Sequence, residues 1–126
     1  MCANFKPLKR EHSYQLDLLE PTFDYKSDVY PSDDCPIILP HQNEWEWRKV
    51  KFGMLSPYAK EVSFKYATYN ARTETVDHKR SFKHAWSNDQ FGLVPVEAIY
   101  EPKYINGKAH WYGIFRQDGK PFTLAA

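Results

Sequence analysis

The chain has 126 residues, with 26% charged and 42% hydrophobic residues and a formal net charge of +1. This length is enough for one domain with one core, and the composition is that of a globular chain rather than a disordered or strongly basic one. There is neither an apolar run near the roughly 20 residues that span a bilayer nor a signal peptide, so a membrane protein or a secreted protein is not expected. Only two cysteines, Cys2 and Cys35, are present, which favours a reducing, cytoplasmic compartment.

The first half of the chain predicts one short helix and two strands. The helix covers residues 11–20 and ends before Pro21, because proline cannot continue a helix. A short strand is expected within residues 30–40, between prolines. Trp45 and Trp47 alternate with charged residues, the period of a half-buried strand, and the later shift of the apolar positions indicates a bulge near Lys49.

The second half predicts a loop, a short helix and a series of strands. Asn106-Gly107 is typical of a two-residue hairpin turn, since both residues tolerate positive φ. The other expected elements are a loop over 66–76, a helix over 79–86, strands over 91–96, 98–105 and 110–115, and a last strand from Pro121. With 17% aromatic residues, we expect a fold of the α+β class that is mostly β.

Cys2 offers the most specific chemistry in the sequence. The small residue after Met1 allows removal of the initiator methionine, which would leave Cys2 with a free α-amine beside its thiol. Both groups are partly nucleophilic at neutral pH, because their reference pKa values lie near 7.7–8 and 8.5. An amine and a thiol on adjacent carbons suit an aldehyde, since the amine forms an imine and the thiol closes a thiazolidine ring. The alternative is a cysteine without a functional role.

Three further residues carry side chains suited to chemistry. Asn70 and Arg72 offer an amide and a guanidinium in the expected loop, and a solvated loop is the alternative for both. Glu101 lies among aromatic residues, where a carboxyl group can act as an acid or base, although a solvent-facing position fits the pattern equally well. The basic residues of 78–84 suit a phosphate backbone or a solvated face. The five histidines show no zinc-binding pattern, so we expect no metal and no cofactor.

Six segments in order match motifs of one known family. They are Met1-Cys2-Ala3-Asn4-Phe5, residues 52–60, Asn70-Ala71-Arg72-Thr73-Glu74-Thr75, Ser81-Phe82-Lys83, residues 95–102 and Gly119-Lys120-Pro121-Phe122. The chain resembles the SRAP family, the SOS-response-associated peptidase-like proteins, along essentially its whole length. The resemblance implies a single SRAP-like domain over residues 1–126, with a mixed β-sheet or barrel core and one or two short helices, and a core that is incomplete at its C-terminus.

The resemblance also implies a function in DNA damage. SRAP proteins bind single-stranded DNA and link covalently to abasic sites through a thiazolidine at the N-terminal cysteine. On the matching positions, Cys2 is the nucleophile, Asn70 orients the sugar and Glu101 transfers protons. DNA contacts are implied for Arg72, Tyr58, Lys83 and Asn4, the last standing where the family usually has arginine.

The departures from the family pattern leave alternatives open. The family's catalytic histidine would lie beyond the last residue of this sequence, so we expect a domain truncated relative to the family and leave open whether it is an active enzyme. A homodimer that completes the core by strand exchange is one expectation. The alternative functions are a non-catalytic or decayed single-strand binder and, last, a thiol (auto)peptidase that uses Cys2, with His110 as its only candidate partner.

Overall fold

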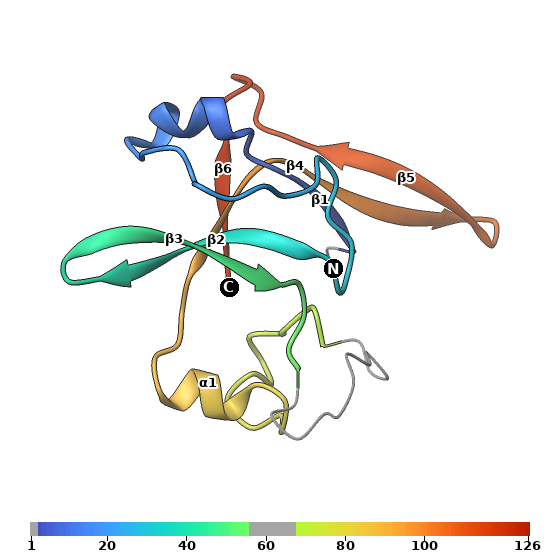
Figure 1. The fold of residues 1–126 in the computed structure, drawn as a ribbon. Helices are drawn as coiled ribbons and strands as arrows, with labels where there is room; N and C mark the ends of the chain where they lie inside the picture. Colours follow the sequence, from blue (N-terminus) through green and yellow to red (C-terminus); the bar gives the residue numbers. More distant parts are fainter. Residues whose placement is uncertain (1–2, 56–67) are drawn as a thin grey trace.

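The computed structural model describes residues 3–55 and 68–126, which form one antiparallel sheet with two short helices (Figure 1). This confirms the α+β, mostly β class. The elements in chain order are β1 (Asn4–Pro7), the 3₁₀ helix η1 (Arg10–Leu16), β2 (Asp34–His41), β3 (Glu44–Lys51), α1 (Lys83–Ser87), β4 (Leu93–Ile105), β5 (Lys108–Ile114) and β6 (Phe122–Ala125). None of the helices in the described ranges has the length and hydropathy needed to cross a membrane.

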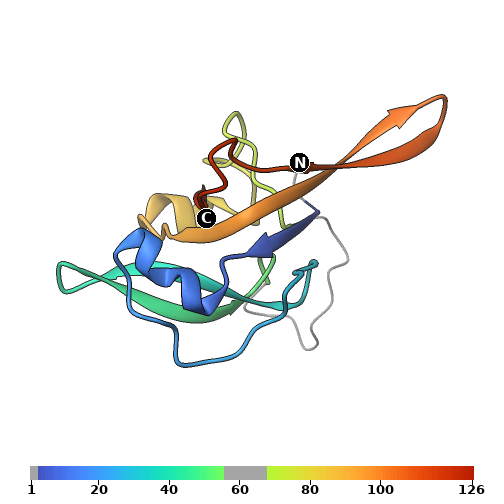
Figure 2. The ribbon, with the colours of Figure 1, turned by 90° about the horizontal axis from the view of Figure 1, so that it is seen from above.

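The long strand β4 organises the sheet. Its first residues, Leu93 to Val96, pair with β6, and its second half, from Ile99 to Ile105, pairs with β5. On the opposite edge β4 pairs with β1, and β2 joins it at the single pair Ile38–Leu93. The outer half of β4 therefore leaves the body of the protein together with β5, as a projecting hairpin (Figure 2).

A bulge at Glu97 divides β4 into two halves of opposite phase. Lys6 pairs with Ala98 and the next residue of β1 pairs with Val96, so Glu97 has no partner in β1. Such an extra residue shifts the alternation of side chains between the two faces by one position. Val96 packs in the core before the bulge and Ile99 packs against the core after it. The sequence predicted two strands here, whereas the structure has one strand with a shifted phase.

The hydrophobic core is made by residues that are distant in sequence. Its buried members are Phe5, Val29, Cys35, Ile37, Val94 and Val96. Phe122 and Leu124 of β6 pack against this cluster. Burial of each large apolar side chain contributes roughly 1.5–3 kcal/mol to the free energy of unfolding, so the N-terminal and C-terminal strands stabilise the same core.

Two expectations for local structure are corrected by the structure. The helix predicted over 11–20 is the 3₁₀ helix η1, and its C-cap residue Asp17 has a left-handed φ of 56°. The predicted helix 79–86 begins only at Lys83, because turns occupy the residues before it.

The bulge predicted near Lys49 is wrong, since β2 and β3 pair without interruption from Asp34–Lys51 to His41–Glu44. The apolar residues of β3 lie on one face in its first half and on the other face in its second half, because each face packs against a different part of the chain. Val50 packs against the core. On the other face, Trp47 Nε1 donates a hydrogen bond of 2.8 Å to the carbonyl oxygen of Leu19.

The hairpin predicted at Asn106-Gly107 is confirmed. Asn106 has a φ of 49° and Gly107 a φ of 75°, and two consecutive positive φ values characterise the type I′ turn. This turn matches the twist of the strands that it joins. It therefore connects β4 to β5 tightly and fixes which residues face one another across the hairpin.

Candidate functional site

Two of the residues implied as site residues, Cys2 and Tyr58, lie outside the described residues. The structure describes the other five, which occupy β1, β4, the segment 68–76 and α1. Their positions determine which of them the fold brings together.

Asn4 lies inside the fold. Its side chain is 6% exposed, and Nδ2 donates a hydrogen bond of 3.1 Å to the carbonyl oxygen of Val29. The neighbouring Phe5 and Val29 also exchange two backbone hydrogen bonds, of 2.9 and 3.1 Å. The amide of Asn4 thus holds the segment around Val29 against the beginning of β1. The contact of Asn4 with DNA remains a prediction.

Glu101 lies in β4 where this strand begins to leave the body of the protein. It is half-buried, and it lies two residues after Ile99, on the same face, because side chains alternate along a strand. Its neighbour Tyr100 pairs with Asn4. The register therefore brings the beginning of β1 next to Glu101.

A row of three aromatic rings connects β1 to the segment that holds Asn70. The rings of Phe5 and Phe52 have centroids 5.1 Å apart, and those of Phe52 and Tyr69 have centroids 5.9 Å apart, both in edge-to-face geometry. Such pairs contribute about 0.5–1.5 kcal/mol each beyond the burial of their area. Asn70 follows Tyr69 directly, so its backbone is held at one end of the row while β1 begins at the other.

Two hydrogen bonds to Met54 also hold the segment that contains Asn70. The backbone N–H of Met54 donates to the carbonyl oxygen of Thr68 at 3.0 Å, and Thr68 Oγ1 donates to the carbonyl oxygen of Met54 at 2.8 Å. The exposed Arg72 lies in the turn that follows, where its carbonyl oxygen accepts hydrogen bonds from the backbone N–H groups of Thr75 and Val76. The beginning of β1 is thus linked to two segments: to the part of β4 around Glu101 by strand pairing, and to the segment 68–72 by the aromatic row. Lys83 is exposed at the first position of α1, further along the chain.

A cluster of polar groups surrounds Glu97, and no sequence pattern indicated it. Oε1 of this bulge residue lies 3.0 Å from Nδ1 of His12 and 3.4 Å from the backbone nitrogen of Lys9, and Oε2 lies 3.2 Å from Nζ of Lys6. Burial alone would raise the pKa of Glu97, but the hydrogen bonds from His12, Lys6 and Lys9 outweigh it and lower this pKa. The cluster ties η1 to the sheet. Glu97 is 85 or more residues away in sequence from His12 and Lys9, a separation that no local pattern reveals.

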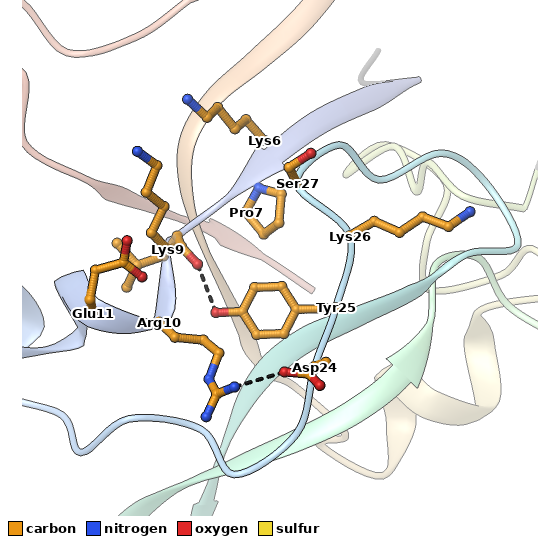
Figure 3. Close-up of a pocket in the computed structure, with 10 residues that line it drawn as sticks. Lys6, Pro7, Lys9, Arg10, Glu11, Asp24, Tyr25, Lys26 and Ser27 are labelled. Atoms are coloured by element: carbon orange, nitrogen blue, oxygen red, sulfur yellow. Dashed lines mark hydrogen bonds and ion pairs between the residues drawn. The ribbon is translucent and has the colours of Figure 1, made fainter.

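A cavity of about 210 Å³ lies between the end of β1, the beginning of η1 and the segment around Tyr25 (Figure 3). The Tyr25 hydroxyl donates a hydrogen bond of 2.7 Å to the carbonyl oxygen of Leu8, and burial raises the pKa of Tyr25 to about 12. Arg10 forms an ion pair of 2.7 Å with Asp24 across the mouth. Four basic side chains line this cavity, those of Lys6, Lys9, Arg10 and Lys26. In the described ranges no group of three His, Cys, Asp or Glu side chains is arranged to hold a metal ion.

Replacing Glu97 by glutamine is expected to lower the free energy of unfolding at pH 7 by about 1–2 kcal/mol, the loss of charged hydrogen bonds reduced by solvent screening. Because the pKa of Glu97 is lowered in the folded protein, its contribution is fully present above the unfolded value near 4.5 and is lost as the pH falls from there through the lowered folded pKa. Urea unfolding should therefore show a larger difference between wild type and Glu97→Gln at pH 7 than at pH 3.5. The exposed Glu44→Gln is the control, and an equal loss for both variants would contradict the assignment.

Cys35 is expected to be unreactive in the native protein. It is 3% exposed, and burial raises the pKa of its thiol from 9.0 to about 12, while the thiolate is the reactive form. In a Cys2→Ser variant, where Cys35 is the remaining thiol, a thiol reagent at pH 8 should react at least about a hundredfold more slowly before unfolding in guanidinium than after it. Rapid labelling of the native variant would show that this part of the core opens readily.

Comparison with known proteins assigns this antiparallel fold and its motif segments to a family. The family model of the SOS response associated peptidase (SRAP) matches residues 1–126. The chain belongs to the SRAP family.

Named relatives and a solved structure support the assignment. The chain is 26% identical over 97 residues to the abasic site processing protein YoaM of Bacillus subtilis and 27% identical over 97 residues to the abasic site processing protein YoqW of the same organism. Each alignment covers 75% of this chain, and 42% and 43% of the respective relative. A crystal structure of a protein from Bordetella bronchiseptica superposes with a TM-score of 0.84 at 29% identity, covering 98% of this chain and 62% of that one. The chain thus spans less than half the length of these two curated relatives.

Proposed function

We propose that this protein binds single-stranded DNA and links covalently to abasic sites through Cys2, after removal of Met1. The SRAP family model and the names of the abasic site processing relatives support the abasic site as the target. The observation that carries the proposal is the pairing of Asn4 with Tyr100, which brings the beginning of β1 next to Glu101. The activity belongs in a reducing cytoplasm, where the cysteine thiol stays available.

The chemistry uses the α-amine and the thiol of Cys2 in sequence. The amine adds to the aldehyde carbon of the ring-opened abasic sugar, and the loss of one water molecule gives an imine. The sulfur then adds to the imine carbon while the thiol proton moves to the nitrogen. The product is a five-membered thiazolidine, and the balance is protein plus DNA minus one water.

Chain connectivity supports a role for Glu101 in these proton transfers. Consecutive Cα atoms are about 3.8 Å apart, so Cys2 can lie no more than about 7.6 Å from the Cα atom of Asn4. Asn4 is itself opposite Tyr100 in the sheet. The carboxyl group of Glu101 is thus the acidic group of β4 nearest along the chain to this pairing, and a carboxyl group at this position is suited to transfer protons as the water molecule leaves.

The segment 68–72 supplies the other groups. The row of Phe5, Phe52 and Tyr69 holds Asn70 close to the beginning of β1, where its amide can donate to and accept from the sugar hydroxyl groups. The exposed Arg72 is suited to a neighbouring phosphate. Tyr58 stacks on a base and Lys83 contacts the backbone farther along the strand.

A crosslinking assay with a single-stranded oligonucleotide that contains one abasic site tests the proposal. Wild type and the matched control Cys35→Ala should form a stable adduct with the mass of protein plus DNA minus one water. Cys2→Ala should form none. Equal adduct from Cys2→Ala would overturn the proposal, and salt-dependent, fully reversible binding by wild type would instead identify a non-covalent single-strand binder.

A further inference from the structure

The hairpin formed by residues 99–105 of β4 and by β5, called the arm below, projects from the body of the protein (Figures 1 and 2). Every residue of β5 is exposed, although the arm carries several large aromatic side chains. Tyr112 is 49% exposed, Trp111 59% and Tyr104 71%. Large exposed aromatic side chains on a projecting hairpin point to a binding function, and the register of the two strands shows which face carries which of them.

The register of the arm assigns its side chains to two chemically different faces. Residues opposite each other in an antiparallel pair share a face. The face of Glu101 carries the pairs Glu101–Tyr112, Lys103–His110 and Ile105–Lys108. The other face carries the pairs Tyr100–Gly113, Pro102–Trp111 and Tyr104–Ala109, and a Cβ atom built on Gly113 would lie 3.4 Å from the ring of Tyr100, as expected for one shared face.

The face of Glu101 combines one aromatic ring with several basic groups. Tyr112, which is 49% exposed, lies directly across from Glu101. Lys103 and Lys108 follow toward the tip, and across residues 3–55 and 68–126 neither side chain forms an ion pair or hydrogen bond. Same-face residues of one strand are about 6.6 Å apart, a step that an extended nucleotide can span.

We propose that the Glu101 face of the arm binds the single strand next to the abasic site, with Tyr112 stacked on the adjacent base and Lys103 and Lys108 on successive phosphates. The inference rests on the proposed function, since Glu101 marks where the reacting sugar lies. It extends the site by three residues that the motifs do not include. Stacking on an aromatic ring combined with nearby cations is how proteins bind single strands without reading their sequence.

Charge favours DNA over a second copy of the chain as the occupant of this face. Two copies that met through the same face would bring Lys103, Lys108 and His110 of one chain against the same basic groups of the other, with Glu101 as the only acidic group in these pairs. A phosphate backbone complements all the basic groups at once.

Fluorescence anisotropy with a labelled, undamaged single-stranded oligonucleotide tests the arm independently of covalent chemistry. Tyr112→Ala should weaken binding about tenfold, the effect of one stacked base. The double variant Lys103→Gln, Lys108→Gln should weaken binding and reduce the slope of log affinity against log salt by about 1.4, because two phosphate contacts are lost. Tyr104→Ala, on the other face, is the matched control and should leave the affinity unchanged, and circular dichroism verifies that each variant is folded.

The outcomes separate this inference from the proposed function. If Cys2-dependent crosslinking persists while Tyr112→Ala and the double lysine variant bind like wild type, the arm proposal fails and the proposed function stands. If crosslinking is absent but both arm variants bind more weakly, the proposed function fails, and the arm proposal stands as a binding face for single strands without its placement next to the abasic site. An equal loss in Tyr104→Ala would overturn the assignment of the face. A dimer in sedimentation that Tyr112→Ala dissociates, with no change in DNA affinity, would identify a second copy as the occupant and overturn the proposal.

Discussion

Replacing Phe5 by alanine is expected to lower the free energy of unfolding by about 3–5 kcal/mol, the cost of removing a large aromatic ring from a packed core. Phe5 is 2% exposed and belongs to the buried cluster. Its ring also contacts Phe52, with centroids 5.1 Å apart. The cavity left by the substitution would therefore open at the end of the core where the aromatic row begins. Urea unfolding followed by circular dichroism measures this loss, with an unchanged m value as the sign that only stability has changed.

The same substitution at an exposed ring is the control. Phe115 is 69% exposed, so Phe115→Ala should change the free energy of unfolding by no more than about 0.5 kcal/mol. The row predicts an effect on function as well, since Tyr69 would lose part of its support next to Asn70. Crosslinking by Phe5→Ala should slow even under conditions where the variant is fully folded. A loss of stability no larger than that of Phe115→Ala would contradict the position of Phe5 in the core.

Replacing Glu101 by glutamine is expected to slow covalent capture of abasic DNA by about a hundredfold, the usual contribution of a positioned acid or base. Glutamine has nearly the same shape but cannot transfer a proton. Since this change leaves the aromatic and basic groups of the arm in place, the affinity for undamaged single strands should stay the same. A quenched time course at saturating DNA gives the rate, and anisotropy gives the affinity.

Glu44→Gln at the exposed beginning of β3 is the control for the change in net charge. It should crosslink at the rate of wild type. If Glu101→Gln crosslinks at the rate of Glu44→Gln, proton transfer by Glu101 is excluded. If it weakens reversible binding while the rate at saturation is unchanged, Glu101 acts in binding and not in the chemistry.

The parts of the fold that follow local rules were predictable from sequence. The Asn106-Gly107 turn, with its two residues of positive φ, predicts the hairpin, and alternating aromatic and charged residues predict β3. Local rules were insufficient where tertiary contacts determine which face of a strand is buried. The apolar positions near Val50 change phase because each face of β3 packs against a different part of the chain, and no bulge is involved.

The candidate site was likewise predictable only in part. The motif segments identified Glu101 and Asn70, and the structure gives each a defined support through the sheet and the aromatic row. It also shows that Asn4 is buried, which its position in a motif did not reveal. The cluster of Glu97 with His12 was invisible to sequence patterns, because the two residues are 85 positions apart and meet only when η1 packs on the bulge.

The extra residue Glu97 makes the fold more sensitive to a change in the length of β4 than to a change in the side chain at this position. The side chain of Glu97 can be exchanged at the modest cost argued above. Deletion of this single residue would instead turn Ile99, Glu101 and Lys103 through half a rotation, so that Ile99 left the core and Glu101 moved to the opposite surface. At Glu97 a substitution is therefore tolerable where a one-residue deletion or insertion is not, and the spacing of Val96 and Ile99 couples the packing of the interior to the orientation of the Glu101 carboxyl group.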